Sequence, residues 1–368
     1  MTTEDRVKAV VEFGFTERQA RFLVTVMLHA GVCLLRQYAA FAGIVHGQKT
    51  TKFFDKLVSR GYATAYPCRH NRGRVYHVHH KPLYRAIGAI DSRHRRPISA
   101  ARVVEGLTLL DAVLASPEVV WLATDEEKRV HLVGVANIAA GKVPHLSVGE
   151  GVSRTVRVFP DKFPIGIDVS GRWVFVYLVT NDHREDFYWF LHRRAGLFSV
   201  LPAWTVRIVL PPPLALLKKR YEDDFRYALA TRRSDLVKDV RWYFNQRRAN
   251  ELDFTPIEQE ERYYELKDCF RATHFQVLYR RWLSEGETAL EVISSQATAD
   301  AVERGAGDVK CHVLPFSYRH LSPLVDVARP RSKGAEKGEE TPARPRPLFE
   351  SSPSLRNAIA EPVGDATV

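Results

Sequence analysis

The sequence has few cysteines and no long hydrophobic run. Its four cysteines, Cys33, Cys68, Cys269 and Cys311, lie far apart and form no C-x-x-C pair. This spacing argues against a disulfide framework and favours reduced thiols in protein cores. No apolar stretch reaches the roughly 18 residues of a membrane span, so we expect no membrane partner. The start, Met-Thr-Thr-Glu-Asp-Arg, lacks a secretory signal pattern, so we expect a cytoplasmic protein.

Several common catalytic motifs are also missing. The sequence contains no G-x-x-x-x-G-K-S/T phosphate loop, no H-E-x-x-H zinc motif and no G-x-S-x-G nucleophile elbow. These absences argue against a P-loop nucleotide hydrolase, a zinc metalloprotease and an α/β-hydrolase. The length of 368 residues is enough for two or three domains with cores of their own.

The net charge is concentrated in the first quarter of the chain. Residues 1–98 contain 17 Lys and Arg against 6 Asp and Glu, and the remaining residues contain 37 of each sign. A basic segment joined to a neutral body is typical of a nucleic-acid-binding module attached to another domain. A solvated basic surface without a nucleic-acid partner is the plainer alternative.

Helical signals follow one another near the N-terminus. Thr16 and Gln19 have the spacing of a capping box, which predicts a first helix that Gly31 ends. A short second helix is predicted over 35–42 and an amphipathic third helix over 48–60, with a glycine between them. This order is typical of a helix-turn-helix, whose second helix enters the major groove of DNA by its N-terminal residues.

The first turn of the predicted third helix contains the residues expected to read bases. Gln can pair with two groups of adenine, and Lys can reach guanine or phosphate. The predicted base-reading residues are Gln48, Lys49, Thr50 and Lys52, with Lys56 one turn further along.

A β-hairpin is predicted after the third helix. Residues 62–66 and 75–79 alternate like strands, and a closing helix is predicted over 81–87. Asn, Gly and basic residues between the strands indicate a hairpin tip that contacts phosphate or the minor groove, as in a winged helix-turn-helix. A three-helix-plus-hairpin module that contacts protein is the alternative. The DNA contacts expected from the hairpin and the following linker are Arg69, His70, Asn71, Arg72, Arg74, Arg93, Arg95 and Arg96.

Seven of the fourteen histidines lie in this module, which raises the question of a zinc site. Structural zinc needs four converging ligands, usually arranged as close pairs. His77 and His79 alternate on one strand, and Cys68 and His70 lie on the opposing arm. This arrangement favours contacts of the histidines with phosphate or backbone, or simple packing, over a metal site. We therefore expect no metal and no cofactor.

The body of the chain alternates between strand and helix patterns. Residues 173–179 form a nearly all-apolar run, as expected for a strand buried on both faces. Other strands are predicted over 129–133, 154–159 and 204–210, and helices over 99–114, 183–197, 234–249 and 257–283. The expected fold combines an N-terminal winged helix-turn-helix with a C-terminal mixed-sheet α/β domain and long C-terminal helices. The predicted regions are 1–90 (DNA-binding), 91–98 (basic linker), 99–250 (α/β domain), 251–328 (helical) and 329–368 (disordered tail).

Short motifs in this order resemble the replication-relaxation family of bacterial plasmids and integrative mobile elements. The matching pieces are Gly14-Phe15-Thr16, the Leu57-Val58-x-Arg60-Gly61-Tyr62 segment, and Pro160-Asp161 before the strand at 173–179. Together they span roughly residues 13 to 240. The resemblance implies a DNA-binding winged helix fused to a core similar to PD-(D/E)xK nucleases.

Such a nuclease core requires an Asp and then a second carboxylate with a Lys on the next strand, which together hold a divalent cation. Asp161 would supply the first carboxylate, but residues 173–179 contain neither acid nor Lys. Asp168 precedes that strand and Asp182 follows it. The resemblance therefore implies an inactive nuclease-like domain. The alternative is a Mg²⁺-dependent endonuclease that uses Asp161, Asp168 and Asp182.

The sequence thus predicts a non-catalytic, sequence-specific double-stranded DNA-binding protein of a mobile element, associated with the nucleoid. It would act as an accessory factor in replication, transfer or recombination, or as a transcriptional regulator. Its body would form a homodimer or recruit a recombinase or replication protein. The alternatives are the endonuclease and a protein-interaction adaptor whose winged helix does not read DNA.

Overall fold

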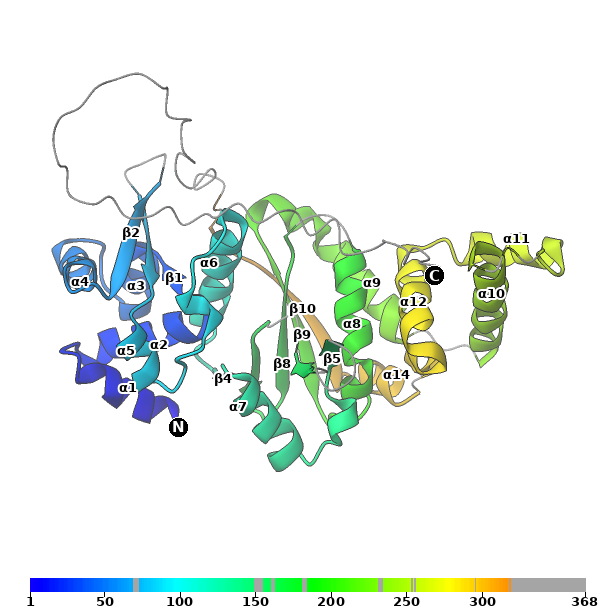
Figure 1. The fold of residues 1–368 in the computed structure, drawn as a ribbon, viewed down its shortest axis with the longest axis horizontal. Coiled ribbons are helices and arrows are strands. Elements are labelled where there is room, and N and C mark those ends of the chain that lie inside the picture. Colours follow the sequence, from blue (N-terminus) through cyan, green and yellow to red (C-terminus); the bar gives the residue numbers. More distant parts are fainter. Residues whose placement is uncertain are drawn as a thin grey trace, which may run out of the picture. The chain divides into compact units, whose positions relative to one another are not determined.

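The computed structural model describes residues 1–68, 73–148, 155–159, 163–180, 184–230, 234–252, 254, 256–294, 296–316 and 318. Helices and strands are both abundant, so the predicted mixed α and β character is confirmed (Figure 1). The described part of the chain divides into two compact units, residues 1–107 with Tyr318, and residues 108–316. No described helix is both long enough and apolar enough to cross a membrane. The tail predicted to be disordered, 329–368, lies outside the described residues.

The N-terminal unit combines helices with one small antiparallel sheet, in which the strand order is β1-β3-β2. The helices predicted over 35–42 and 48–60 and the hairpin strands are present, whereas α1 and β1 were not predicted. Its elements are α1 (Thr3–Val11), α2 (Glu17–His29), β1 (Val32–Cys33), α3 (Leu35–Ala42), α4 (Gln48–Ser59), β2 (Ala63–Pro67), β3 (Arg74–Val78), α5 (Lys81–Ala86), the 3-10 turn η1 (Arg93–Arg95) and the start of α6 (Ala100–Leu114).

Local signals begin and end these helices. The Thr16 hydroxyl accepts the Gln19 N–H at 3.3 Å and the Gln19 side chain accepts the Thr16 N–H at 3.1 Å, so the predicted capping box of α2 is confirmed. After α2 the chain passes through Gly31 with φ +71. A Cβ there would lie 2.4 Å from the His94 carbonyl oxygen, so η1 can pack against this turn only because the residue is glycine.

The C-terminal unit is built on a five-stranded mixed sheet with strand order β10-β9-β8-β7-β4. β8, β9 and β10 run parallel, whereas β7 is antiparallel to both of its neighbours. The elements are β4 (Val119–Leu122), α7 (Asp125–Arg129), the π-helical turn η2 (Val130–Val135), η3 (Ala140–Lys142), β5 (His145–Val148), β6 (Thr155–Val158), β7 (Ile165–Asp168), β8 (Trp173–Leu178), α8 (Glu185–Phe198), β9 (Trp204–Leu210), η5 (Pro212–Leu217), α9 (Lys218–Ala230), α10 (Ser234–Leu252), α11 (Glu260–Cys269), α12 (Thr273–Glu285), η6 (Gly286–Leu290), α13 (Glu291–Ser294), α14 (Gln296–Glu303) and β10 (Gly307–Val313).

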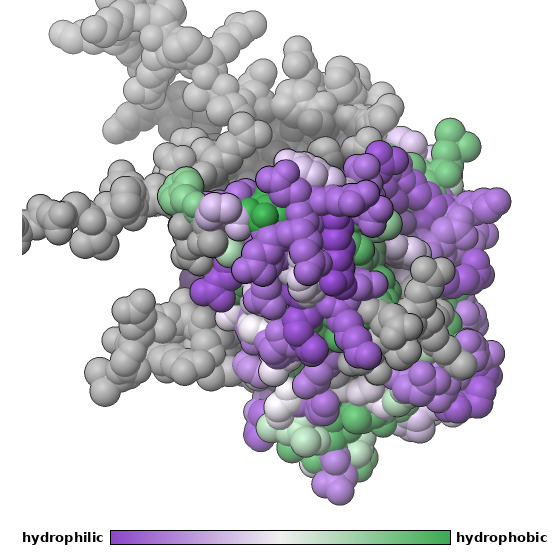
Figure 2. Space-filling model, turned by 90° about the vertical axis from the view of Figure 1, so that its right-hand side faces the viewer, coloured by the Kyte–Doolittle hydropathy of each residue, from purple (hydrophilic) through white to green (hydrophobic). Residues whose placement is uncertain are grey.

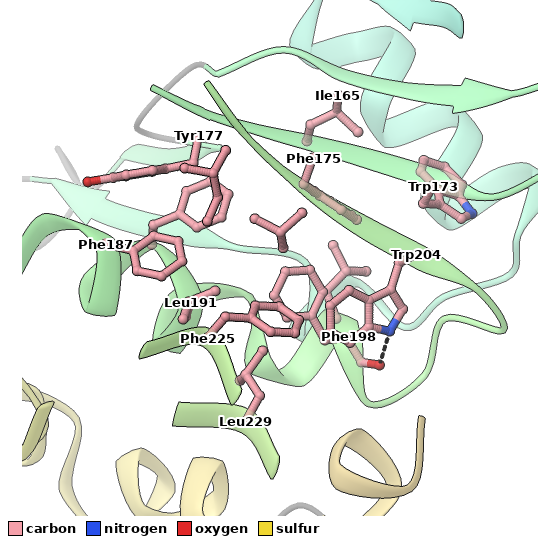
Figure 3. Packing of buried hydrophobic residues seen from close by; sticks show 14 of the residues in the cluster. Ile165, Trp173, Phe175, Tyr177, Phe187, Leu191, Phe198, Trp204, Phe225 and Leu229 are labelled. Atoms are coloured by element: carbon pink, nitrogen blue, oxygen red, sulfur yellow. Dashed lines mark hydrogen bonds between the residues drawn. The ribbon is translucent and has the colours of Figure 1, made fainter. Parts of the chain in front are cut away.

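Strand β8 lies at the centre of this unit, and all six of its residues are buried, as predicted. Phe175 and Tyr177 face a large aromatic cluster under α8 and α9 (Figure 3). In that cluster the rings of Phe198 and Trp204 stack at 4.1 Å, and the Trp204 indole N–H donates to the Phe198 carbonyl at 3.0 Å. Val176 faces the opposite layer with residues of α6. The sheet is therefore covered on both faces at β8.

Helices α10 to α13 form a second, separate apolar cluster in the same unit. Phe244 contacts Tyr279 and Trp282, with ring centroids 5.1 and 5.8 Å apart. Hydrophilic residues cover most of the outer face of this helical region over α10 and α11 (Figure 2). The strand patterns in the body of the chain therefore belong to the sheet and its aromatic cluster, and the long helices that follow them belong to this second cluster.

Two predictions for the body were wrong. Residues 129–133 are helical rather than a strand, because the Thr124–Glu127 capping box starts α7 and the chain continues into η2. The helix predicted over 257–283 is two helices, since α11 ends at Cys269 and the ring of the next residue, Phe270, packs on Phe275 at 4.6 Å. The apolar pattern alone does not distinguish a strand from a helix over 129–133, or one long helix from two over 257–283.

Replacing Gly166 on β7 by Ala should weaken the C-terminal unit. A Cβ at this position would lie 2.3 Å from Val119 Cγ1 and 3.0 Å from the Val120 carbonyl oxygen, so β4 must shift. We expect a loss of about 1–3 kcal/mol in the free energy of unfolding. Tryptophan fluorescence during urea unfolding measures this unit selectively, because all six tryptophans lie in it. Gly134→Ala is the control, since nothing lies within 4 Å of its Cβ position, and an equal loss there would contradict the explanation.

Acid should destabilise the same unit through a buried histidine. Burial lowers the pKa of His274 to about 4, from 6.5 in the unfolded chain. The unfolded state therefore binds more protons between these values, and stability falls as the pH drops from 6.5 towards 4. At pH 5 this single group should cost about 2 kcal/mol. His274→Phe should reduce the difference in urea midpoint between pH 7.5 and pH 5, and an unchanged difference would rule out this cause.

Candidate nucleic-acid interface

Aromatic packing fixes the rotation of α4 in the N-terminal unit. Phe53 lies against Tyr38 and Phe54 against Tyr76, each with ring centroids 4.4 Å apart. Phe53, Phe54 and Leu57 are completely buried or nearly so. β2 packs against the same helix (Figure 1). Because one face of α4 is held in the core, the residues on its opposite face must point to solvent.

The outward face of α4 carries polar and basic side chains. Gln48, Lys49 and Lys52 are exposed, and none of them forms a hydrogen bond or ion pair within the described part of the chain. Thr51 and Asp55 share this face and are also exposed, although neither was predicted as a contact. The first turn of α4 contains no acidic residue and its N-cap, Gly47, makes no side-chain hydrogen bond. The free N–H groups at this end of α4 can therefore bind an anion.

Thr50 is a correction to the predicted set of base-reading residues. Its side chain is fully buried, and its hydroxyl has no hydrogen-bond partner among the described residues. Thr50 precedes Phe53, Phe54 and Leu57 by three, four and seven positions, which places it on the buried stripe of the helix. This spacing was visible in the sequence and indicates Thr51 as the exposed threonine.

The turn between α3 and α4 presents further side chains. Gly43 ends α3 in the left-handed conformation with φ +62, and the Ile44 N–H donates to the Ala39 carbonyl at 3.0 Å. Val45 follows and is 90% exposed, and His46 is also exposed. An exposed Val next to polar residues can contact a thymine methyl group, and Val45 was not among the predicted contacts.

Lys56 has a different position from the one expected. Its ammonium donates to the Gly14 carbonyl and lies 5.0 Å from the centre of the Phe15 ring. The neighbouring Arg60 donates to the Phe13 carbonyl at 3.1 Å. Both cations hold the α1–α2 turn against the end of α4, so Lys56 contributes to the fold of this unit.

Four of the eight DNA contacts expected from the hairpin and the linker lie within the described residues. Arg74 begins β3 and is exposed, whereas Arg69, His70, Asn71 and Arg72 lie outside the described residues. In the linker, Arg93 and Arg96 are exposed, and the Arg95 Nε donates to the Ile90 carbonyl at 3.2 Å. The basic linker therefore folds back onto the N-terminal unit through η1.

The histidines of β3 have packing roles. The His77 Nε2 is 2.9 Å from the His94 carbonyl, and burial lowers the pKa of His77 to about 4. The neutral ring therefore donates from Nε2 to this carbonyl and links β3 to η1. The His79 Nε2 is 2.8 Å from the Thr64 hydroxyl on β2, and burial also lowers its pKa. No cluster of three His, Cys, Asp or Glu that could hold a metal was found among the described residues.

One of the three carboxylates considered for a nuclease site lies within the described residues. Asp168 closes the tight turn between β7 and β8, where its Oδ1 accepts the Ser170 hydroxyl at 2.6 Å and the Arg172 N–H at 3.0 Å. Asp161 and Asp182 lie outside the described residues. No residue of β8 is acidic or basic. Of the three carboxylates considered, the described residues therefore contain only Asp168, and it is engaged in a turn.

Comparisons with known proteins leave these features to be interpreted on their own. No protein-family model, no curated protein and no solved structure matches this chain.

Proposed function

We propose that this protein is a double-stranded DNA-binding protein without catalytic activity, in which the N-terminal unit acts as a winged helix-turn-helix. The observation that carries the proposal is the outward face of α4. Gln48, Lys49 and Lys52 are exposed there and have no partner in the described part of the chain. Base-reading and phosphate-binding side chains need this freedom, because they must exchange water for DNA without breaking internal contacts.

The arrangement of the unit supports this proposal. A short α3, a turn of four residues over 44–47 with a left-handed glycine before it, and α4 occur in the order of a helix-turn-helix. The β2–β3 hairpin follows as the wing, and β1 completes its sheet. In this proposal the N-terminal half of α4 enters the major groove. Gln48 reads adenine, while Lys49 and Lys52 contact guanine or phosphate.

Charge supports a polyanionic partner. The excess of 11 positive charges over residues 1–98 equals the net charge of the whole chain. Neutralising phosphates releases condensed counterions, which drives binding and makes it sensitive to salt. The positive end of the α4 dipole adds to this attraction, since it lies beside Lys49.

The wider role is proposed from the resemblance to the replication-relaxation family. We infer an accessory or regulatory factor of a mobile genetic element, which acts in replication, transfer or recombination. The C-terminal unit is proposed to mediate dimerisation or to recruit a recombinase or replication protein. A dimer would favour a palindromic site whose half-sites are about one helical turn apart.

Removing the two free lysines of α4 should weaken DNA binding. We expect Lys49→Ala/Lys52→Ala to reduce affinity for DNA upstream of its own gene by roughly tenfold or more, and to lower the salt slope by about 1–2. Fluorescence anisotropy across a salt series measures both. Lys8→Ala/Lys81→Ala, on α1 and α5, removes the same two charges from exposed sites outside α4 and should have little effect. Equal losses in both variants would leave only a general charge effect and overturn the proposed site.

Reading of bases should depend on Gln48. Gln48→Ala should reduce the preference for the native site over a scrambled duplex, while non-specific affinity remains, because the side chain carries no charge. Competition between the two duplexes in the same anisotropy assay measures the preference. If the wild-type protein shows no preference and its binding disappears near physiological salt, the protein-interaction adaptor becomes the better explanation.

The endonuclease alternative has its own test. We expect no Mg²⁺-dependent nicking of supercoiled plasmid, because β8 has no carboxylate or Lys to hold the metal. Agarose-gel analysis of wild type and Asp161→Ala with and without Mg²⁺ decides the matter. Nicking by wild type that disappears in Asp161→Ala would establish the nuclease instead.

A further inference from the structure

The C-terminal unit contains a cavity that the proposed DNA contacts do not use. Its volume is about 900 Å³, which lies within the range of roughly 300–1,000 Å³ typical of small-molecule sites. Three parts of the chain form its walls: the segment 139–145, the second half of α8, and the stretch from the end of α12 to α13. The cavity is thus formed by segments that are far apart in the sequence.

One arginine of the cavity wall is committed to the fold. Arg281 donates through Nε to Glu285 at 2.7 Å and through Nη1 to the His192 carbonyl at 2.6 Å. Its side chain is only 14% exposed. Arg281 and Glu285 therefore neutralise each other and add no net charge for a ligand.

Two other cations of the wall remain available. The Arg193 side chain is exposed, its guanidinium lies 5.2 Å from the centre of the Trp189 ring, and no carboxylate pairs with it among the described residues. Lys142 Nζ is 4.0 Å from the Glu291 carboxylate, and these side chains are 43% and 67% exposed. Such an exposed pair contributes at most about 1 kcal/mol. A ligand anion can therefore replace Glu291 beside Lys142 and pair with Arg193.

The hydroxyl groups of the cavity wall define a second requirement that a ligand must meet. Ser199 donates to the Gly196 carbonyl at 2.9 Å, Ser284 to the Arg281 carbonyl at 2.9 Å, and Thr288 to the Glu285 carbonyl at 2.8 Å. Each hydroxyl hydrogen is thus used within the protein, and each oxygen can still accept. These three oxygens fit a ligand that carries several hydrogen-bond donors, such as the hydroxyls of a sugar.

We propose that this cavity binds a phosphorylated sugar, either as a free sugar phosphate or as part of a nucleotide. The phosphate binds between Arg193 and Lys142, because a charge-assisted contact with an arginine is among the strongest available to a phosphate. The sugar hydroxyls donate to Ser199, Ser284 and Thr288. His145 lines the same cavity and donates from Nδ1 to the Val143 carbonyl at 3.0 Å, which leaves its Nε2 for the ligand. This site is independent of the proposed DNA contacts.

Isothermal titration calorimetry of the full chain tests the proposal with four probes: ribose 5-phosphate, AMP, inorganic phosphate and ribose. We expect ribose 5-phosphate to bind more tightly than phosphate or ribose. It has both a phosphate for the two cations and hydroxyls for the three serine and threonine oxygens, whereas phosphate and ribose each have only one of these. Tighter binding of AMP would assign a nucleotide, and weaker or equal binding a sugar phosphate. Absence of binding by both, or phosphate binding as tightly as ribose 5-phosphate, would overturn the proposal.

Variants then locate the ligand. Arg193→Ala should weaken ribose 5-phosphate binding by roughly tenfold or more, and Ser284→Ala by about three- to tenfold. Arg193 makes no ion pair within the described chain, so its removal should leave the thermal midpoint nearly unchanged. Arg248→Ala on α10 removes an exposed arginine outside the cavity lining and should leave binding as in wild type. Unchanged affinity in Arg193→Ala, or an equal loss in Arg248→Ala, would exclude this cavity as the site.

Discussion

The burial of two adjacent phenylalanines determines which face of α4 the N-terminal unit exposes. Phe53 and Phe54 are both held by aromatic rings of neighbouring elements. Successive residues of a helix are about 100° apart, so any rotation that exposed Thr50 would carry these rings towards water. Exposing each ring would cost about 2–3 kcal/mol. The orientation of Gln48, Lys49 and Lys52 therefore follows from the core and not from their own contacts.

Burial of apolar side chains also constrains the C-terminal unit. In the N-terminal unit it leaves polar side chains exposed on α4, whereas here it leaves the central strand without polar side chains that could bind a metal. β8 is buried on both faces, and its side chains form the centre of two apolar layers. A catalytic metal would need carboxylates and a lysine in such a strand, and burying unpaired charges costs several kcal/mol each. An all-apolar β8 stabilises the sheet, and it therefore contains none of the carboxylates or lysines that nuclease chemistry requires.

Short-range signals made much of the fold predictable. Capping at Thr16, helical periodicity through α4 and the apolar run of β8 all depend on residues within a few positions of one another. β10 was not predicted, because it is defined by parallel pairing with β9, about 100 residues earlier in the chain. Local patterns contain no information about such pairing.

The candidate site was predicted to a similar extent and for similar reasons. The exposed face of α4 follows from periodicity, and a stricter use of that periodicity places Thr50 inside and Thr51 outside. The position of Lys56 could not be predicted, because its partner is the Gly14 carbonyl of another turn. The cavity beside Arg193 was missed as well, since three distant segments form it.

The distribution of charge connects these observations. Beyond residue 98 the chain has as many acidic as basic side chains, and many of them pair internally. Arg184 with Asp224, Arg207 with Glu118 and Arg247 with Glu251 are within 3.2 Å. Paired charges release few counterions and contribute little to the attraction of a polyanion. The body of the chain is therefore close to neutral overall. Arg193, which has no carboxylate partner among the described residues, and Lys142, whose partner Glu291 is exposed, both line the proposed cavity.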